Sequence, residues 1–492
     1  MGGERGNRIW DDWSIYLNLQ YKMKKTCTNI DYKVLLEPTG DPFIDSGGYV
    51  LKALSDYYPE YDVLELIMLA TKIYVDNWDA KINPFFLNSK ITQPAFKVEK
   101  KKEETKLYFL GLLEETLPYI IGHCRVTGKK TKLFPAGRDN TVLSGSGTFV
   151  NFHNSFDTGI MLSKEALIRY HFLPLGCELL QGRVCVINST NQQTTELYAK
   201  ECCDRILYDL GQNASQGLLR NESRSPGTAI FRFLDKVLIH YADNNTGSEY
   251  ITLYHFTNFG ASPDVQIYTL PFQAFNFYKE TRKSQYKANW NIFVNHHYRC
   301  SDYKKIQYND EANSFIALDK KQEISINEDD FKYWRNTIYD KLLIGANIIS
   351  DVRKWSIHHH FDLDLLECYL INIQNMKKET VDKINQIADF ILSYNSEVDM
   401  KKVLTKLNGV KNPYLLRRFV LKVIEDNYKR GNEMPLVTVE DYVDFLFPDS
   451  NSWMETRDVL LISIYQKLHE RHLTVEVEET TFDEKEFGDD EI

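Results

Sequence analysis

Residues 124–154 bring together the side chains best suited to holding a charged or polar ligand. Four cations come first, and clustered glycines, amides and hydroxyls follow them. Glycine lets the backbone approach a phosphate or a base edge closely, while serine and asparagine supply short donors and acceptors that a turn can position. The composition predicts a ligand-holding loop, with a plain surface loop rich in turn-forming residues as the alternative. The candidate residues are Lys129, Lys130, Lys132, Arg138, Asn140, Ser144, Ser146, Asn151 and Asn154.

A phosphate-binding P-loop is the nearest nucleotide motif, but the spacing of this stretch excludes it. Five residues separate Gly122 from Gly128 where the motif has four, and Lys130 rather than Ser or Thr follows Lys129. The Gly145-Ser146-Gly147 segment lacks the third glycine of a dinucleotide-binding loop. The sequence therefore predicts no nucleotide cofactor.

Histidines and carboxylates at 358–364, in the order HHHFDLD, form the best candidate for a metal site. Imidazole and carboxylate groups are the usual ligands of hydrolytic metals. On a helix only His358 and Asp362 would share one face, because three adjacent histidines point in different directions. A solvated helix start is the competing interpretation, and the His296-His297 pair is a weaker candidate.

Motifs that would indicate an enzyme are missing from the sequence. It contains neither a G-x-S-x-G nucleophile elbow nor an H-E-x-x-H zinc motif. We therefore predict a protein that is not an enzyme and carries no cofactor.

Length and composition are those of an ordinary soluble protein. With 492 residues, of which 43% are hydrophobic, the chain can bury a large core and form two or three domains. It has no run of 18 apolar residues, and its start, from Met1 to Arg5, lacks the apolar core of a secretory signal. Eight cysteines without regular spacing suit a reducing compartment. These features predict a cytoplasmic protein without a membrane partner.

The formal net charge of −10 is unevenly distributed along the chain. Residues 474–492 hold nine acidic side chains and one lysine, so the remainder is close to neutral and can carry local basic patches. The acidic tail is predicted to be disordered and solvated. The charge therefore does not exclude nucleic acid as a partner.

Local patterns predict an α+β fold with a change of texture near residue 328. Residues 1–327 mix short β-branched and aromatic runs with amphipathic helices, which predicts a mixed α/β N-terminal body. Residues 328–473 show long helical periods joined by short connections, which predicts an antiparallel helical bundle, followed by the tail 474–492. In the N-terminal body we expect helices after Gly48, at 62–76 and at 194–211, and strands at 184–187, 250–254 and 265–268.

Three cap signals mark helix starts in the predicted bundle. Asn412 followed by Pro413 is a cap with proline at the first helical position. Thr438 with Asp441 opens a second helix, and Ser452 with Glu455 has the spacing of a capping box before a third.

Four scattered segments, taken in order, resemble the large subunit of type I-B CRISPR Cascade complexes. They are Thr39-Gly40-Asp41-Pro42-Phe43-x-Asp45-x-Gly47, Phe134-Pro135-Ala136-Gly137, Asn151-Phe152 and Leu173-Pro174-Leu175-Gly176. The resemblance spans the N-terminal two thirds of the chain, and the helical C-terminus agrees in architecture.

Many members of that family carry two CxxC pairs, the first followed by glycine. The first pair corresponds here to Cys124-Arg125-Val126-Thr127-Gly128, and the second is replaced near Ser163 to Ala166. Because a thiolate zinc site needs about four ligands, the resemblance implies that this chain has lost the zinc, and we predict a protein without a bound metal.

The resemblance implies a non-catalytic role in antiviral defence. Such subunits lie at the 5′ end of the guide RNA, recognise the protospacer-adjacent motif beside the target DNA duplex, and help to recruit a separate helicase-nuclease. The other implied partners are the backbone, 5′-handle-binding and small subunits of the complex. As in other guide-directed effectors, base pairing would read most of the target and the protein only the short flank.

The same resemblance assigns roles to the candidate residues of this chain. The flank-reading candidates are Asn140, Ser144, Ser146, Asn151 and Asn154, since amides can read the acceptor pattern of a minor groove. The candidates for contacts with the nucleic-acid backbone are Lys129, Lys130, Lys132, Arg138, Arg417 and Arg418.

The predicted bundle is expected to act as a module similar to the small subunit, lying along the target and displaced strands. In the resembling family this region is sometimes also made as a separate small protein from an internal start, and Met376 precedes a helix beginning near Glu379. A start at Met376 would remove the helix expected at 362–374, so an upstream non-AUG start is an alternative.

Two other functions remain open at this point. One is a metal-dependent nuclease that uses His358, Asp362 and Asp364. The other is a purely structural scaffold subunit, which would bind partner proteins without a preference among flanking sequences.

Overall fold

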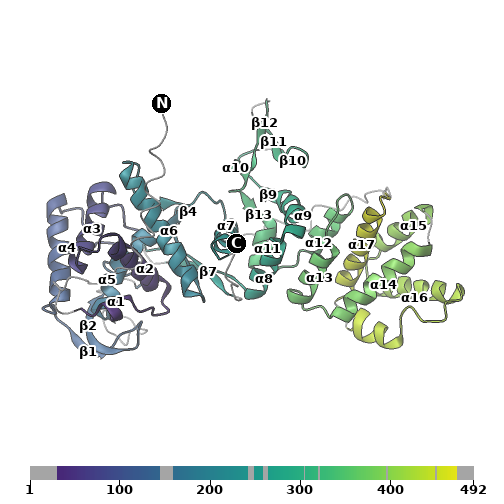
Figure 1. Cartoon of the computed structure of the whole chain (residues 1–492), viewed down its shortest axis with the longest axis horizontal. Helices are drawn as coiled ribbons and strands as arrows, with labels where there is room; N and C mark the ends of the chain where they lie inside the picture. Colours follow the sequence, from purple (N-terminus) through teal and green to yellow (C-terminus); the bar gives the residue numbers. More distant parts are fainter. Residues whose placement is uncertain are drawn as a thin grey trace, which may run out of the picture. The chain divides into compact units, whose positions relative to one another are not determined.

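The computed structural model describes residues 30–144, 159–241, 249–258, 264–303, 305–319, 322–394, 397–448 and 452–473. Helices account for 54% and strands for 14% of the structure, and the strands form several small sheets (Figure 1). The predicted α+β fold class is therefore confirmed.

The chain divides into two compact units. Unit 1 comprises Met1–Glu222 and Thr252–Ile267, and unit 2 comprises Ser223–Ile251 and Tyr268–Ile492.

Unit 1 combines helices with two small sheets. Its helices are α1 (Tyr32–Leu36), α2 (Pro42–Tyr57), α3 (Val63–Lys72) continued by the π-helical η3 (Ile73–Asn77), α4 (Val98–Leu113), α5 (Lys164–Phe172) continued by the 3-10 turn η5 (Leu173–Gly176), and α6 (Gln192–Gly211). Its strands are β1 (Ile120–His123), β2 (Lys130–Ala136), β3 (Ile160–Leu162), β4 (Glu178–Leu180), β5 (Arg183–Ser189) and β6 (Leu219–Arg220), and β7 (Ile251–Thr257) and β8 (Asp264–Leu270) complete its larger sheet.

Helix α2 starts earlier than the sequence suggested. The Asp41 side chain caps it by accepting hydrogen bonds from the backbone N–H groups of Phe43 and Ile44, at 3.0 and 2.8 Å. Pro42 then occupies the first helical position, so the glycines at 47 and 48 lie inside the helix rather than before it.

The predicted strands lie in the larger sheet of unit 1, and the smaller sheet was not predicted. The larger sheet has the order β6-β4-β5-β7-β8, with β4 and β5 antiparallel and β4 and β6 parallel. The inner strand β5 buries four consecutive residues, Val184 to Ile187, which explains its continuous apolar run. The smaller sheet pairs β1, β2 and β3 antiparallel.

Unit 2 is mainly helical. Its helices are α7 (Pro226–His240), α8 (Phe272–Thr281), α9 (Ser284–Asn295), α10 (Glu328–Phe331), α11 (Thr337–Leu343), α12 (Ile349–Ser356), α13 (Leu363–Asn372), α14 (Lys378–Tyr394), α15 (Glu397–Asn408), α16 (Pro413–Lys429), the π-helical η6 (Asp441–Leu446) and α17 (Trp453–Glu470). Its strands are β9 (Tyr298–Arg299), β10 (Ile306–Asn309), β11 (Ser314–Asp319), β12 (Gln322–Ile326) and β13 (Arg335–Asn336).

The last helices pack around α17, which contacts α12, α14, α15 and α16. The Asn412 side chain caps α16 by accepting from the Leu415 N–H at 2.9 Å, and Thr438 and Asp441 bond to each other's backbone N–H groups, as their spacing predicted. The capping box expected at Ser452 does not form, because the Glu455 carboxylate instead accepts from the Asn347 side-chain amide at 2.8 Å.

Unit 2 begins at Ser223, with Thr252–Ile267 returning to unit 1, whereas the change of sequence texture lies near residue 328. Aromatic packing accounts for the difference. The rings of Phe277 on α8 and Tyr369 on α13 meet edge to face, with their centres 5.3 Å apart. The Phe293 ring on α9 meets those of Trp355 and Phe361 in the same way, with centres 5.7 and 5.4 Å apart. These contacts join residues 272–297 to the C-terminal helices in one core.

None of the helices formed by the described residues is long and apolar enough to cross a membrane.

Candidate nucleic-acid interface

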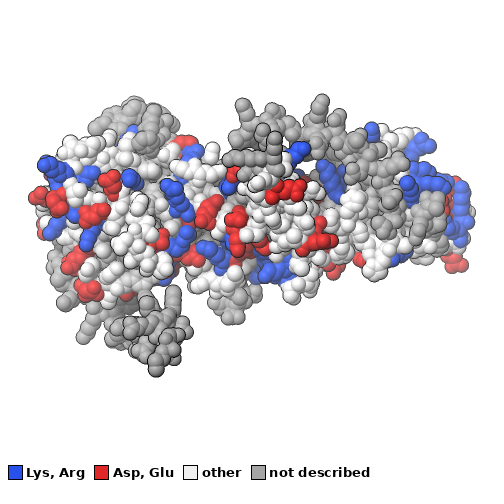
Figure 2. All heavy atoms as spheres, turned by 90° about the horizontal axis from the view of Figure 1, so that it is seen from above, with Lys and Arg blue, Asp and Glu red and all other residues white. Residues whose placement is uncertain are grey.

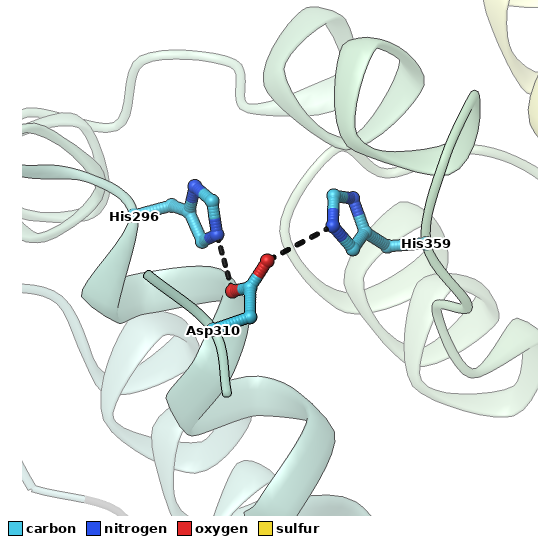
Figure 3. A group of neighbouring side chains, drawn as sticks. All are labelled: His296, Asp310 and His359. Atoms are coloured by element: carbon cyan, nitrogen blue, oxygen red, sulfur yellow. Dashed lines mark hydrogen bonds and ion pairs between the residues drawn. The ribbon is translucent and has the colours of Figure 1, made fainter. Parts of the chain in front are cut away.

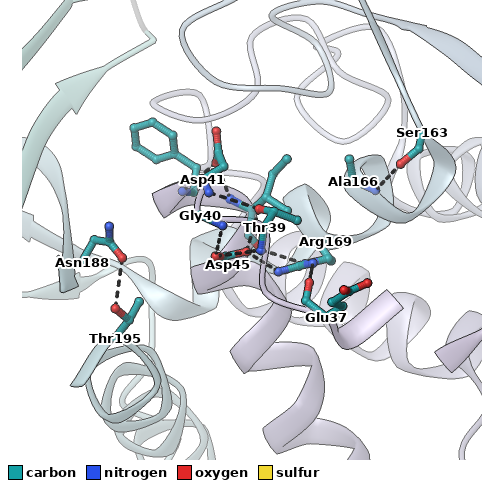
Figure 4. Close-up of polar contacts among 12 residues, drawn as sticks. Glu37, Thr39, Gly40, Asp41, Asp45, Ser163, Ala166, Arg169, Asn188 and Thr195 are labelled. Atoms are coloured by element: carbon teal, nitrogen blue, oxygen red, sulfur yellow. Dashed lines mark hydrogen bonds and ion pairs between the residues drawn. The ribbon is translucent and has the colours of Figure 1, made fainter. Parts of the chain in front are cut away.

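A buried ion pair joins the first segment of the resemblance to helix α5. The Asp45 carboxylate on α2 accepts hydrogen bonds from the Thr39 backbone N–H and hydroxyl, both at 2.8 Å, and from the Gly40 N–H at 2.8 Å. Arg169 on α5 donates to the same carboxylate at 2.5 Å and to the carbonyls of Glu37 and Ile44 at 2.6 and 3.1 Å (Figure 4). Both side chains are almost fully buried, at 3% exposed for Arg169 and 8% for Asp45.

Glycines allow α2 to lie directly against α5 and η5. A Cβ atom added at Gly47 would lie 2.0 Å from the Arg169 carbonyl oxygen, and one at Gly176 would lie 2.6 Å from the Ser46 Oγ. The Ser46 hydroxyl also donates to the Gly176 carbonyl at 3.2 Å. The first and last segments of the resemblance therefore form one packed junction.

The four positions that correspond to the CxxC pairs also meet. Cys124 and Thr127 lie on the turn between β1 and β2, and the Ser163 backbone N–H points at the Cys124 Sγ, 3.4 Å away. Ser163 caps α5 by accepting from the Ala166 N–H at 3.3 Å. The turn Cys124–Gly128 therefore meets the start of α5, and we call this place the knuckle; of the four positions, Cys124 alone carries a thiol.

Hydrogen bonds from the backbone also change the pKa of the Cys124 thiol. Burial alone would raise the pKa of its thiol, but hydrogen bonds from the backbone N–H groups of Thr127 and Ser163 lower it below its ordinary value. Backbone N–H groups aimed at one sulfur are the arrangement that stabilises a thiolate.

A cavity of about 290 Å³ opens beside this knuckle. Three cations line it, together with several hydroxyl groups and two carboxylates. The polar lining consists of Glu37, Thr39, Thr127, Lys129, Lys130, Thr131, Ser163, Glu165 and Arg169. The cavity therefore holds two of the predicted backbone-contacting lysines and part of the buried ion pair.

Two of the predicted loop lysines already form ion pairs with carboxylates of this chain. The Lys129 ammonium pairs with Glu37 at 2.5 Å, and Lys132 pairs with Glu115, which Lys164 also contacts at 2.7 Å. Hydrogen bonds from the two lysines lower the pKa of the Glu115 carboxyl. Lys130, in contrast, is exposed beside the cavity.

Two of the predicted amide and hydroxyl residues hold the loop itself. The Asn140 side-chain oxygen Oδ1 accepts a hydrogen bond from the Gly137 backbone N–H at 2.9 Å, and the side-chain NH2 group of Asn140 donates to the Tyr108 hydroxyl at 2.9 Å. Ser144 lies 2.5 Å from the Thr141 hydroxyl oxygen. Arg138 donates to the Asn258 carbonyl at 3.1 Å. Three further candidates, Ser146, Asn151 and Asn154, lie outside the described residues.

The basic stretch of the C-terminal helices is concentrated on α15 and α16. Residues 397–430 contain nine Lys and Arg against four Asp and Glu. Figure 2 shows blue side chains gathered at the right-hand end, where Figure 1 labels these helices. Between them lies an open groove of about 600 Å³, whose charged lining is Lys406, Arg418, Lys422 and Glu425.

The two arginines predicted for this region have different neighbours. The Arg418 side chain lines the groove and lies 5.7 Å from the Tyr414 ring centre. Arg417 lies 5.4 Å from the Phe447 ring centre and is not among the groove residues. Both arginines are exposed.

The structure does not assemble His358, Asp362 and Asp364 into a metal-binding group. Residues 357–362 form a connection between α12 and α13 rather than a helix, and His358 and Asp364 are exposed. The Asp362 carboxylate accepts from the Asn289 amide at 3.3 Å. The helical face on which the prediction rested is therefore absent from this part of the chain.

Sequence reasoning missed Arg169 and Glu115, which organise the region around the knuckle. Arg169 carried a usable signal, because it is a lone cation in the apolar stretch Ala166 to Phe172 of α5. Glu115 lies just beyond α4 and carried no such signal.

Comparisons with known protein families, with curated proteins and with solved structures found no match for this chain.

Proposed function

We propose that the chain is the large subunit of a type I-B CRISPR Cascade complex. In this role it binds the 5′ end of the guide RNA and the target DNA in the cytoplasm, recognises the protospacer-adjacent motif and supports recruitment of the helicase-nuclease. Its partners are the backbone, 5′-handle-binding and small subunits, and it performs no chemistry itself.

One observation carries the proposal: the first and last segments that resemble the family, far apart in the sequence, meet at one junction. Asp45 from the first segment bonds Arg169, Ser46 bonds Gly176 from the last segment, and Cys124 receives the Ser163 N–H. Independent surface loops have no reason to meet in this way. An architecture shared with the family accounts for the residue types of these segments and for their order.

The charge distribution supports contacts with nucleic acid at two places. Lys130 and the Lys129–Glu37 pair flank the cavity of unit 1, and the groove between α15 and α16 presents cations beside Tyr414. Cations hold phosphates without reading sequence, while an aromatic ring can stack on an exposed base. We assign the first place to the flanking duplex and the second to a single strand.

Asn140 and Ser144 form hydrogen bonds within the protein, which separates them from the other flank-reading candidates. These two residues shape the loop, so direct readout falls to Ser146, Asn151 and Asn154. An alanine substitution at the residue that contacts the flank should weaken the free energy of binding to a duplex with the preferred flank by roughly 1–3 kcal/mol, and reduce the difference in affinity between flanks.

Binding of target duplexes by the complex reconstituted with guide RNA tests the proposal. Lys129→Gln with Lys130→Gln should weaken binding to every flank and reduce the slope of log K against log salt by about one per lost phosphate contact. Lys100→Gln with Lys106→Gln on α4 is the matched control and should leave the slope unchanged. A chain that does not assemble with the other subunits and guide RNA would contradict the proposal.

The same reconstitution separates the two alternatives. A scaffold subunit would assemble normally, but none of the loop substitutions would change the preference among flanks. A nuclease would cleave DNA as the isolated chain with Mg²⁺ or Mn²⁺ and lose that activity in His358→Ala.

A further inference from the structure

Two histidines and one aspartate from three separate elements of unit 2 converge on one point (Figure 3). His296 is at the C-terminal end of α9, Asp310 is in the turn between β10 and β11, and His359 is in the connection after α12. The His296 Nε2 lies 2.5 Å from one Asp310 carboxylate oxygen, and the His359 Nε2 lies 3.3 Å from the other. Ligand-type atoms of all three lie within 4.8 Å of one another.

Aromatic side chains hold both imidazole rings in place. The His359 ring stacks parallel on Trp355, with ring centres 3.7 Å apart and an interplanar angle of 10°. The His296 ring makes edge contacts with Trp355 at 4.7 Å and with Tyr308 at 4.6 Å. The two nitrogen donors are therefore positioned before any ligand arrives, which lowers the ordering cost of binding.

The donor set suits a transition-metal ion. Neutral imidazole and carboxylate are the ligands of Zn²⁺ sites that keep one position open, with metal–ligand distances of about 2.0–2.2 Å. In a tetrahedral site these lengths put neighbouring ligand atoms roughly 3.3 Å apart, so both nitrogen–oxygen separations already lie within about 1 Å of the required value.

We propose that His296, Asp310 and His359 form a binding site for a Zn²⁺-type divalent transition-metal ion. Each neutral imidazole coordinates through Nε2 as its Nδ1–H tautomer, so the Nε2 proton passes through solvent to Nδ1 and the ion takes the place of the two hydrogen bonds to the carboxylate. The fourth position of the ion stays open to water or to an oxygen of a ligand. The bound ion ties the turn of the β10–β11 hairpin to the connection after α12. The site is distinct from the knuckle around Cys124 and from the His358, Asp362, Asp364 set.

The test uses the full chain, stripped of metal with a chelator and titrated with Co²⁺. Visible absorption reports coordinated Co²⁺, and competition by Zn²⁺ gives its affinity. We expect one saturable site per chain. Mg²⁺ should not compete, because it prefers six oxygen ligands.

Substitutions at the site and beside it assign the ligands. Asp310→Asn and His359→Phe should each lower Zn²⁺ affinity by more than roughly 100-fold, since even partners outside the coordination sphere cost about 10–100-fold. His359→Phe keeps a ring on Trp355, and His358→Phe is the matched control that should leave affinity unchanged. Thermal unfolding without metal shows whether each variant is folded, and Asp310→Asn decides the matter if His359→Phe is not.

Two outcomes would overturn the proposal. One is the absence of saturable Co²⁺ or Zn²⁺ binding by the folded chain, in which case the carboxylate only joins two imidazoles by hydrogen bonds. The other is equal loss of affinity in His358→Phe and His359→Phe, which would place the ion elsewhere in the histidine run.

Discussion

Replacement of Arg169 by methionine tests the junction that joins the segments of the resemblance. Methionine keeps much of the side-chain volume but removes the guanidinium, which donates to Asp45 and to the carbonyls of Glu37 and Ile44. Breaking a buried ion pair from one side costs roughly 3–5 kcal/mol, because the remaining charge is left without its partner. We expect a loss of that size in the stability of unit 1.

A matched control comes from a half-exposed ion pair made by α2, the helix that carries Asp45. Lys52 on α2 pairs with Glu196 at 2.7 Å, and their side chains are 44% and 33% exposed. Lys52→Met should therefore cost about 0.2–1 kcal/mol. A double variant, Asp45→Asn with Arg169→Met, should recover part of the loss, since it removes the stranded charge.

Native-state hydrogen exchange read by mass spectrometry is the appropriate assay, because it follows unit 1 separately from unit 2. Peptides covering 42–57 and 164–172 report the opening free energies of α2 and α5. Equal effects of Arg169→Met and Lys52→Met on these peptides would refute the reasoning that the buried pair fastens the junction.

Three further predictions address stability and binding. Burial lowers the pKa of His171 from 6.5 to about 4, so between these pH values the unfolded state binds a proton that the folded state does not. The free energy of unfolding should therefore fall by about 1.4 kcal/mol per pH unit as the pH drops from 6.5 to about 4. In urea titrations at different pH values, His171→Gln should flatten this slope. Gly176→Ala would place a Cβ 2.6 Å from the Ser46 Oγ and should cost roughly 1–3 kcal/mol by hydrogen exchange of α5, with the open position Gly217→Ala as the control. Arg418→Glu should weaken binding of single-stranded DNA by the complex, and reduce its salt dependence, more than Arg417→Glu does, because Arg418 lines the groove and Arg417 does not. Equal effects of the two substitutions would place the strand elsewhere.

Elements defined by their own local pattern could be predicted from the sequence. The expected helices at 62–76 and 194–211 appear as α3 with η3 and as α6, and the strands at 184–187, 250–254 and 265–268 appear as β5, β7 and β8 with shifted ends. Except in β8, where Ile267 is exposed, their apolar periods agree with their final burial, so local preference and tertiary packing favour the same structure.

Features set by contacts between distant residues could not be predicted in this way. The start of α2 was missed because two glycines in sequence argue against a helix interior, and their reason is the close approach of Arg169, more than a hundred residues away. The grouping of 272–297 with the C-terminal helices depends on ring contacts such as Phe277 with Tyr369.

In the candidate sites, too, contacts between distant residues could not be predicted from the local sequence. The cations and amides of 129–144 were found from composition, but nothing local reveals that Lys129 pairs with Glu37 or that Asn140 holds a turn. For the metal candidate, sequence reasoning singled out the histidine run and assumed a helix there. The chain instead forms a connection, which turns His359 toward Asp310.

The most direct test of the proposed function is the flank preference of the reconstituted guide-loaded complex with and without this chain. Affinity is measured for target duplexes that share one guide-matched sequence and differ only in the adjacent flank. We predict that the complete complex binds one set of flanks at least about tenfold more tightly, which corresponds to one lost base contact of roughly 1.4 kcal/mol, and that Ser146→Ala, Asn151→Ala or Asn154→Ala reduces this ratio. Equal affinity for all flanks, or a ratio that persists when the chain is left out, would contradict the assignment of flank recognition to this protein.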